Sequence, residues 1–303
     1  MRVSIWNGSY ITYADDTNIY WESTTDMINE TINTANNVLD KVSNYCNNNM
    51  LRLNEGKCKF MILGSKNAIR KISEINLNNV TINNKNMERL HIARVLGVTM
   101  DEVLSWRKHV NLCIGKAMAN FFQISRSSKF LEEKAKVNLC DSIVLSQFNY
   151  CDVVFSNMDK YLEQKIQKVQ NLCIRFIFEI KKRHTCDYNS FRQKLNWLDM
   201  NKRRIKHGLT LIYKILHGYA PHYLSDSFTL TNEIHTVNTR NSSNSIWIDK
   251  SITSKIHRNS YRFHMAQIFN LLPENIKNSV SIDAFQNKLT KHLMDNELVL
   301  PQT

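Results

Sequence analysis

The chain has 303 residues, of which 43% are hydrophobic and 22% charged, proportions typical of a globular protein with one large or two smaller domains. No apolar run approaches the roughly 18 residues of a membrane span, and the N-terminus has no apolar signal segment, so we expect neither a membrane-spanning nor a secreted protein. Forty basic residues against 27 acidic ones give a net charge of +13, which favours a polyanionic partner.

The first predicted element is a β-hairpin at residues 10–21. Two β-prone segments, residues 10–13 and 17–21, flank a polar turn that contains Asp15 and Asp16. Adjacent carboxylates repel each other unless a cation neutralises them. Enzymes that transfer nucleotidyl groups use carboxylates to hold two Mg²⁺ ions about 3.5–4 Å apart. Aspartate is also an ordinary turn residue, so the two acids, taken alone, favour a hairpin that they merely close.

The next eighty residues alternate between helical and strand patterns. Apolar residues at helical spacing predict a helix over residues 25–47. Short strands are expected at residues 51–54 and 60–63, around a loop that holds Lys57, and further strands at residues 80–82 and 94–99. The first hundred residues therefore have the composition of an α+β domain.

After Trp106 the pattern becomes helical. The periodicity predicts helices over residues 109–127, 132–148 and 159–179, then a basic helical stretch that ends near Lys214, and finally helices over residues 260–272 and 282–293. A segment rich in Thr, Asn and Ser, at about residues 229–244, predicts a linker or loop.

The charge is concentrated between Lys181 and Lys214, where ten basic residues face only Asp187 and Asp199, a net +8 in 34 residues. This segment predicts a nucleic-acid contact through phosphates, and a solvated helix face is the alternative. The candidate contacts are Lys181, Lys182, Arg183, Lys202, Arg203, Arg204 and Lys206.

The seven cysteines are scattered and odd in number, with no C-x-x-C pair and no histidine pair at zinc-ligand spacing. They predict reduced, mostly buried thiols of an intracellular protein and do not support a zinc site.

Several short motifs, in order along nearly the whole chain, resemble the C-terminal part of a non-LTR (LINE-type, jockey-like) retrotransposon reverse transcriptase. The motifs are YADDT at residues 13–17, LRLN followed by Lys57, VLGVTMD at residues 95–101 followed by Leu104, Trp106 and His109, LSQFNYCD at residues 145–152, YKILHG at residues 213–218, PHYL at residues 221–224, and FNLLP at residues 269–273.

The resemblance implies an α+β fold in which residues 1–105 are a partial reverse-transcriptase palm, residues 106–180 a helical thumb and residues 181–303 a basic helical C-terminal region. In the palm, Asp15 and Asp16 are expected to bind Mg²⁺, with Asp15 the more direct ligand, and Tyr13 is expected to pack beneath the incoming nucleotide or primer end.

Two further segments receive roles from the same resemblance. Lys57 is expected to protonate or neutralise the leaving pyrophosphate. The turn at Leu96, Gly97 and Val98 is expected to hold the primer backbone, with Gly97 allowing close approach. Without the resemblance, Lys57 also fits an ordinary exposed lysine, and Gly97 a plain hairpin glycine.

The family carries a third catalytic aspartate, the fingers and an endonuclease upstream of this hairpin. No acidic residue precedes Tyr13 here, so we expect a chain that begins inside the palm and is inactive alone. The complete enzyme would be an RNA-directed DNA polymerase that takes an RNA template, a DNA primer and dNTPs and works in the cytoplasm and nucleus. The alternatives are a non-catalytic nucleic-acid-binding remnant and a decayed relic without a selected function.

Overall fold

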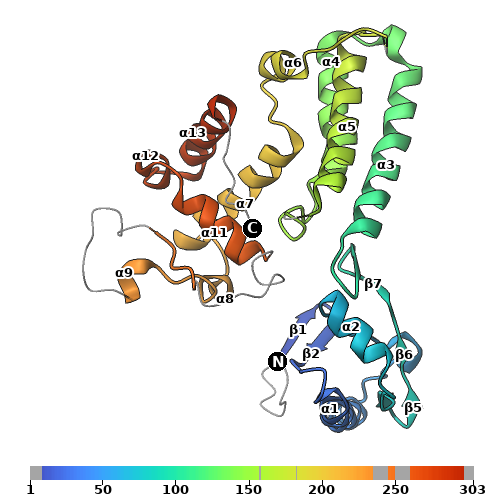
Figure 1. Cartoon of the computed structure of the whole chain (residues 1–303). Helices are drawn as coiled ribbons and strands as arrows, with labels where there is room; N and C mark the ends of the chain where they lie inside the picture. Colours follow the sequence, from blue (N-terminus) through green and yellow to red (C-terminus); the bar gives the residue numbers. More distant parts are fainter. Residues whose placement is uncertain (1–8, 157, 182, 235–244, 250–259, 297–303) are drawn as a thin grey trace. The chain divides into compact units, whose positions relative to one another are not determined.

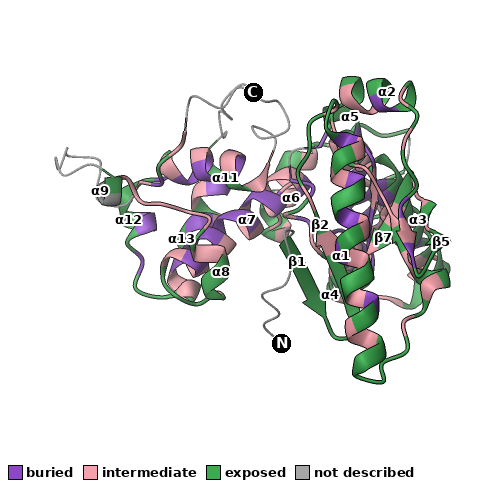
Figure 2. Cartoon of the chain, turned by 90° about the horizontal axis from the view of Figure 1, so that it is seen from below, coloured by how far each residue is buried: buried purple, intermediate pink, exposed green. Residues whose placement is uncertain are grey.

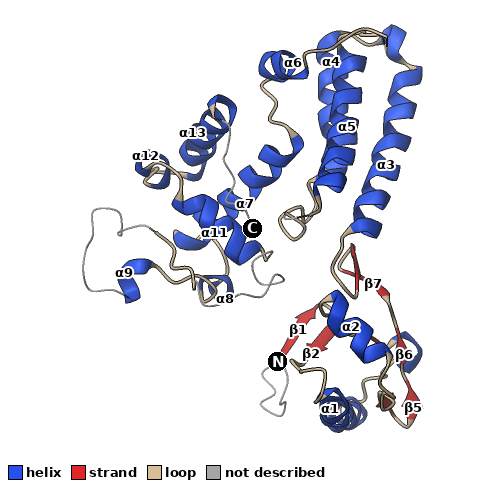
Figure 3. Cartoon of the chain, in the orientation of Figure 1, coloured by secondary structure: helices blue, strands red, loops and turns tan. Residues whose placement is uncertain are grey.

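The computed structural model describes residues 9–156, 158–181, 183–234, 245–249 and 260–296, and it divides into two compact units, Met1–Ser105 and Trp106–Thr303 (Figure 1). The first unit mixes helices with small sheets, and every named strand of the described residues lies in it (Figure 3). The α+β class expected from the sequence is confirmed, while the assignment of the first unit to a palm stays a prediction.

The chain begins its described part with the predicted hairpin. Strands β1 (Ser9–Tyr13) and β2 (Asp16–Tyr20) pair antiparallel, and Tyr13 faces Asp16 across the two-residue turn. Every residue of both strands is exposed except Ile19, so β1 is drawn wholly in the exposed colour in Figure 2. The hairpin therefore contributes almost nothing to a core, and a two-stranded ribbon of this kind is marginal by itself.

Helix α1 (Ile28–Asn48) carries the small core of the first unit. Its buried face includes Ile28 and Ile32, which pack in one cluster with Val80. A second face of α1 forms hydrogen bonds, through asparagine side chains, with the backbone of the extended segment after residue 75. Asn29 accepts from the backbone N–H of Asn78, and Asn36 accepts from that of Thr81 and donates to the carbonyl of Asn79 at 2.9 Å each. These amides replace a neighbouring strand as hydrogen-bond partners for an extended segment.

The remaining strands of the first unit are short. β3 (Lys59–Phe60) pairs parallel with β6 (Glu88–Arg89), β4 (Thr81–Ile82) pairs with β5 (Lys85–Asn86), and β7 (Ile92–Val95) pairs with β8 (Val98–Asp101). The strand predicted at residues 51–54 is wrong, because no regular element occupies it, and only Phe60 of the strand predicted at residues 60–63 is in a strand.

A short helix that the sequence pattern missed, α2 (Lys66–Ser73), follows this segment. The side chain of Ser65 accepts from the N–H of Ala68 and so caps the helix.

The second unit begins with two helices that lie side by side and run in the same direction, α3 (Arg107–Arg126) and α5 (Lys160–Ile177), with Arg107 next to Asp159 at their starts and Phe121 next to Phe176 near their ends (Figure 1). Between them run a short turn, η2 (Ser128–Phe130), helix α4 (Glu133–Leu139), a π-helical turn η3 (Cys140–Val144) and a 3₁₀ turn η4 (Leu145–Phe148). The single helix predicted over residues 132–148 is therefore helical throughout but changes its hydrogen-bonding pattern twice. Its buried side chains and those of α3 and α5 share one core cluster.

The rest of the second unit is a helical bundle around α7 (Met200–Leu216). Its other helices are α6 (Tyr188–Leu195), α8 (His222–Ser225), α9 (Thr231–Ile234), α11 (Tyr261–Asn270), α12 (Glu274–Lys277) and α13 (Ile282–Asp295). Helix α7 packs on α5, α11 and α13. The predicted basic helical stretch is broken at Asn196, whose φ of 54° ends α6, and Asp199 caps the start of α7.

Two other sequence expectations concern this part of the chain. The helices predicted near residues 260–272 and 282–293 are confirmed by α11 and α13. The predicted loop at residues 229–244 begins with α9, and residues 235–244 lie outside the described part. Across the described residues, none of the helices combines the length and apolarity that crossing a membrane requires.

Candidate functional site

The two predicted metal ligands lie at the tip of the β1–β2 hairpin. Ala14 and Asp15 form the turn, and Asp16 is the first residue of β2. Ala14 has a φ of 52°, a left-handed conformation that costs a non-glycine residue roughly 1–2 kcal/mol. Strain of this kind persists only where the surrounding structure enforces it, and it concentrates at functional sites. Asp15 and Asp16 are both exposed, and neither carboxylate takes part in an ion pair or hydrogen bond of the described residues.

The donor set at the tip suits magnesium in its chemistry. Mg²⁺ prefers oxygen ligands, keeps several of its waters, and is often bound through one or two carboxylates together with substrate phosphates. Asp15 and Asp16 supply two such carboxylates without a competing cation. Within the described ranges, no group of three or more His, Cys, Asp and Glu side chains is placed to hold a metal ion. The tip therefore offers two protein ligands and leaves the remaining positions to water and phosphate.

Two residues expected to serve this site are also solvent-accessible. Tyr13, at the end of β1, is 65% exposed, so its ring is free to stack against a ligand. Lys57 is exposed at the end of the 3₁₀ turn η1 (Glu55–Lys57), and its ammonium group has no hydrogen-bond partner in the described part of the chain. The turn is held by Glu55, which accepts hydrogen bonds from Lys85 and from Asn83, and these bonds lower the pKa of the Glu55 carboxyl.

The predicted primer-binding turn connects β7 and β8. Leu96 and Gly97 both have positive φ, 44° and 84°, as a tight hairpin turn that matches strand twist requires. Leu96 is 42% exposed, whereas Val98 is only 6% exposed and belongs to the core of the first unit. The prediction that Val98 contacts the primer is therefore not compatible with its burial, and the available contacts reduce to Leu96 and the backbone at Gly97.

An ionic cluster supports the base of this hairpin. The buried Glu102 accepts from Arg89 at 2.7 Å and lies 2.8 Å from Nδ1 of His91. Burial alone would raise the pKa of Glu102, but the hydrogen bonds from His91 and Arg89 outweigh it and keep the pKa below its ordinary value. Because Arg89 lies in β6, the cluster ties the β7–β8 hairpin to a neighbouring strand.

The basic stretch predicted to bind nucleic acid is largely used inside the second unit. Arg204 is 3% exposed, and its guanidinium pairs with Glu163 of α5 at 3.3 Å. Burial lowers the pKa of Arg204 and raises that of Glu163. The expectation that Arg204 contacts phosphates is wrong for this structure, because the guanidinium faces the protein interior.

Two more side chains of α7 form similar contacts. Arg203 donates to Asp141 of η3 at 2.6 Å, and Nδ1 of His207 lies 2.5 Å from the buried carboxylate of Asp152. Together with Arg204 they join α7 to the helices before it. Lys206 is half-buried, and burial lowers its pKa.

The cations of this stretch that remain accessible are few. Lys181 and Arg183 are exposed. Lys182 lies outside the described residues. Lys202 is partly exposed, and its ammonium donates to the carbonyl of Asn296 at 3.0 Å.

A basic surface that sequence reasoning missed lies on α3. This 20-residue helix contains four cations, Arg107, Lys108, Lys116 and Arg126, and no acidic residue, a formal charge of +4. All four side chains are exposed. The sequence could have indicated this surface, because residues 107–126 contain no acidic residue, although their basic residues are not dense. Arg107 pairs with Asp159 at 3.9 Å, whereas Lys108, Lys116 and Arg126 form no ion pair in the described residues. Phosphate recognition depends on unpaired cations, so these three suit it better than the paired stretch on α7.

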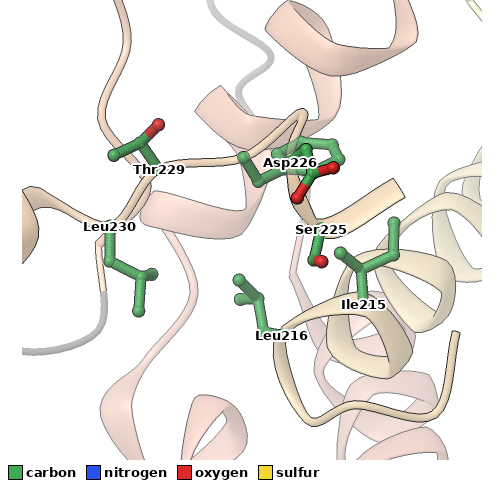
Figure 4. A pocket seen from close by; sticks show the side chains of 7 residues that line it. Ile215, Leu216, Ser225, Asp226, Thr229 and Leu230 are labelled. Carbon is green, nitrogen blue, oxygen red and sulfur yellow. The ribbon is translucent and has the colours of Figure 1, made fainter. Parts of the chain in front are cut away.

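A hollow of about 380 Å³ opens beside the end of α7 (Figure 4). Its lining includes Ile215, Leu216, Ser225 and Asp226, and it contains none of the predicted site residues.

No family model, no curated protein and no solved structure matches this chain. The function therefore has to be argued from the residues themselves. The structure brings Tyr13, Asp15 and Asp16 to one hairpin tip and Leu96 and Gly97 to another, with Lys57 on a separate exposed turn.

Proposed function

We propose that this chain is the C-terminal part of an RNA-directed DNA polymerase of a non-LTR retrotransposon, with its metal ligands on the β1–β2 hairpin and its nucleic-acid surface on α3. The observation that carries the proposal is the exposed, unpaired carboxylate pair at a strained hairpin tip. The order of motifs along the chain supports the family.

In the complete enzyme each residue has a defined task. Asp15 and Asp16 would hold Mg²⁺, and the bound ion would supply activation of the primer 3′-oxygen and neutralisation of charge on the phosphates. Tyr13 packs under the primer end or the base of the dNTP, and Lys57 donates a proton to the departing pyrophosphate. The turn at Leu96 and Gly97 holds the primer backbone.

Two carboxylates do not complete a two-metal site. Because the described residues place no third carboxylate with Asp15 and Asp16, we do not expect this chain alone to polymerise. Its testable activities are metal binding at the tip and binding of an RNA–DNA hybrid.

Metal binding at the tip is testable with terbium(III), a hard cation that takes oxygen ligands and emits light when a nearby tyrosine is excited. Tyr13, next to the turn, is the expected donor. We expect Asp15→Asn with Asp16→Asn to remove most of the emission that Mg²⁺ competes away. The matched control, Asp40→Asn with Glu74→Gln, removes the same charge from two exposed carboxylates elsewhere in the first unit and should leave that emission unchanged. Equal emission from all three proteins would refute a metal site at the hairpin.

Hybrid binding is testable by fluorescence anisotropy over a range of salt concentrations. Replacing Lys108 and Lys116 by glutamine should lower the salt slope by about 0.7–0.9 for each phosphate that the helix no longer neutralises. An unchanged slope would exclude α3 as the duplex surface.

The second candidate function is a nucleic-acid-binding protein without catalysis. It is favoured by the accessible charge of α3, which does not depend on a metal. The two functions separate in a complex reconstituted with the missing polymerase segments. Replacement of Asp15 must abolish DNA synthesis under the first and leave RNA binding unaltered under the second.

A further inference from the structure

A shallow cleft of about 280 Å³ lies between α12 and α13 in the C-terminal bundle. One side is formed by Lys288, Lys291 and His292, which follow one another at helical spacing and so share one face of α13. The opposite side is formed by Pro273, Asn275 and Ile276. This cleft contains none of the residues of the metal tip or of α3.

The charge around the cleft is predominantly positive. Lys288 and Lys291 are exposed at its edge, and Asp295 is the single acidic residue in its lining. A further cation comes from α7, because the ammonium of Lys202 donates to the carbonyl of Asn296, which also lines the cleft. Two lysines of α13 thus line the cleft, and a third lysine, from α7, contacts one of its lining residues.

The donors of the cleft are held in place by the protein. The ammonium of Lys288 donates to the carbonyl of Asn275 across the cleft at 2.8 Å, which leaves two of its protons for a ligand. The side-chain amide of Asn296 lies 3.0 Å from Nδ1 of His292 and donates to it, so the ring proton of the neutral imidazole is on Nε2. Groups fixed in this way lose less conformational entropy when they bind an anion.

We propose that this cleft is a phosphate-binding site that takes one phosphodiester of a nucleic-acid strand. A single-stranded RNA or a single-stranded DNA presents this chemistry equally well. The lysines of α13 bind the phosphate oxygens, Nε2–H of His292 donates a further hydrogen bond, and the exposed ring of Pro273 contacts the sugar. The proposal does not depend on the metal tip, since it uses no residue of the first unit.

The test is a salt titration of the full chain with two labelled 12-mers of one sequence, an RNA and a DNA, followed by fluorescence anisotropy. For Lys288→Gln with Lys291→Gln, the slope of log K against log salt should fall by about 1.4, from about 0.7 for each single-strand phosphate contact. At 0.1 M salt this slope change corresponds to a roughly 25-fold loss of affinity. Weaker binding of both strands, or of one alone, supports the proposal and identifies which strand the site accepts.

The matched control is Lys66→Gln with Lys71→Gln, which removes the same charge from exposed positions of α2. An equal loss of affinity in this control would attribute the effect to net charge and overturn the proposal, as would an unchanged slope in the cleft variant. Because Lys288 also contacts Asn275, Lys291→Gln alone provides a second variant that breaks no hydrogen bond of the described residues. A cleft variant that loses only competition by inorganic phosphate, with strand binding intact, would reduce the site to a free-anion site and likewise overturn the proposal. The hybrid-binding test on α3 is independent, since its variants leave α13 unchanged.

Discussion

The buried ion pair between Arg204 and Glu163 offers a quantitative test of how α7 is held. With the nitrogen and oxygen 3.3 Å apart, their attraction is about 5 kcal/mol at an effective dielectric constant of about 20. Much of this is offset by desolvation, because the Arg204 side chain is only 4% exposed. The Nε group of Arg204 also has no hydrogen-bond partner among the described residues, which reduces what the native pair contributes.

We therefore expect Arg204→Met to destabilise the protein by about 3 kcal/mol, the lower end of the range for breaking a buried pair. The lower end applies because Glu163 is 26% exposed and can recover part of its hydration. For a unit of this size the change lowers the melting temperature by roughly 6–12 °C. The double variant, Arg204→Met with Glu163→Met, should return to within about 1 kcal/mol of the native protein, because neither charge is then left alone.

Urea unfolding followed by circular dichroism measures both variants. Arg183→Met is the control, since Arg183 is exposed and forms no interaction in the described residues, and its effect should stay within about 0.5 kcal/mol. If Arg204→Met is as stable as the control, the guanidinium of Arg204 is not held in the protein interior. Arg204 would then again be a candidate for phosphate binding.

Three further predictions concern packing and protonation. Burial, with a smaller contribution from the Arg204 charge, lowers the pKa of His264 below 6.5. The stability that depends on the neutral imidazole is therefore fully present above pH 6.5 and is lost as the pH falls. The variant His264→Leu should show a weaker dependence of the melting temperature on pH between pH 7 and 5. Gly208→Ala places a Cβ 2.6 Å from the sulfur of Met265 and should lower the unfolding free energy by about 1–3 kcal/mol, whereas Gly115→Ala, in open space, should raise it by up to about 1 kcal/mol. Asn36→Ala removes two hydrogen bonds to the extended segment beside α1 and should cost about 1–3 kcal/mol by urea unfolding.

The spacing of apolar residues was sufficient to predict the long helices but not the short strands. Helices such as α1, α3 and α5 present one apolar stripe over five or more turns, and their positions follow from that stripe within a few residues. The strands of the first unit are two to five residues long, and a run of that length contains too few alternations to separate strand from coil. Residues 51–54 alternate like a strand, yet the structure gives them no pairing partner.

The asparagine ladder shows a second limit of sequence patterns. Asn29 and Asn36 lie seven residues apart on α1, and nothing in that spacing indicates that their amides pair with backbone groups forty residues later. A polar helix face is normally expected to be exposed to solvent. In α1 this face instead forms hydrogen bonds with an extended segment of the same chain. Long-range contacts decide whether such a face is exposed or covered, so the sequence alone could not predict that this face of α1 binds another segment.

The same reasoning explains why we propose α3 rather than α7 as the nucleic-acid surface. A count of charges along the chain treats every cation alike, although a cation paired with an acidic side chain of the fold cannot also neutralise a phosphate without leaving that acid unpaired. Arg203 and Arg204 have such partners on η3 and α5, while Lys108 and Lys116 have none in the described residues. The two acids lie 62 and 41 positions away in sequence, so only the fold separates the structural cations from the available ones. If Lys108 and Lys116 prove dispensable for hybrid binding while Arg203 proves essential, the ion pairs must open on binding, and α7 rather than α3 is the surface that nucleic acid selects.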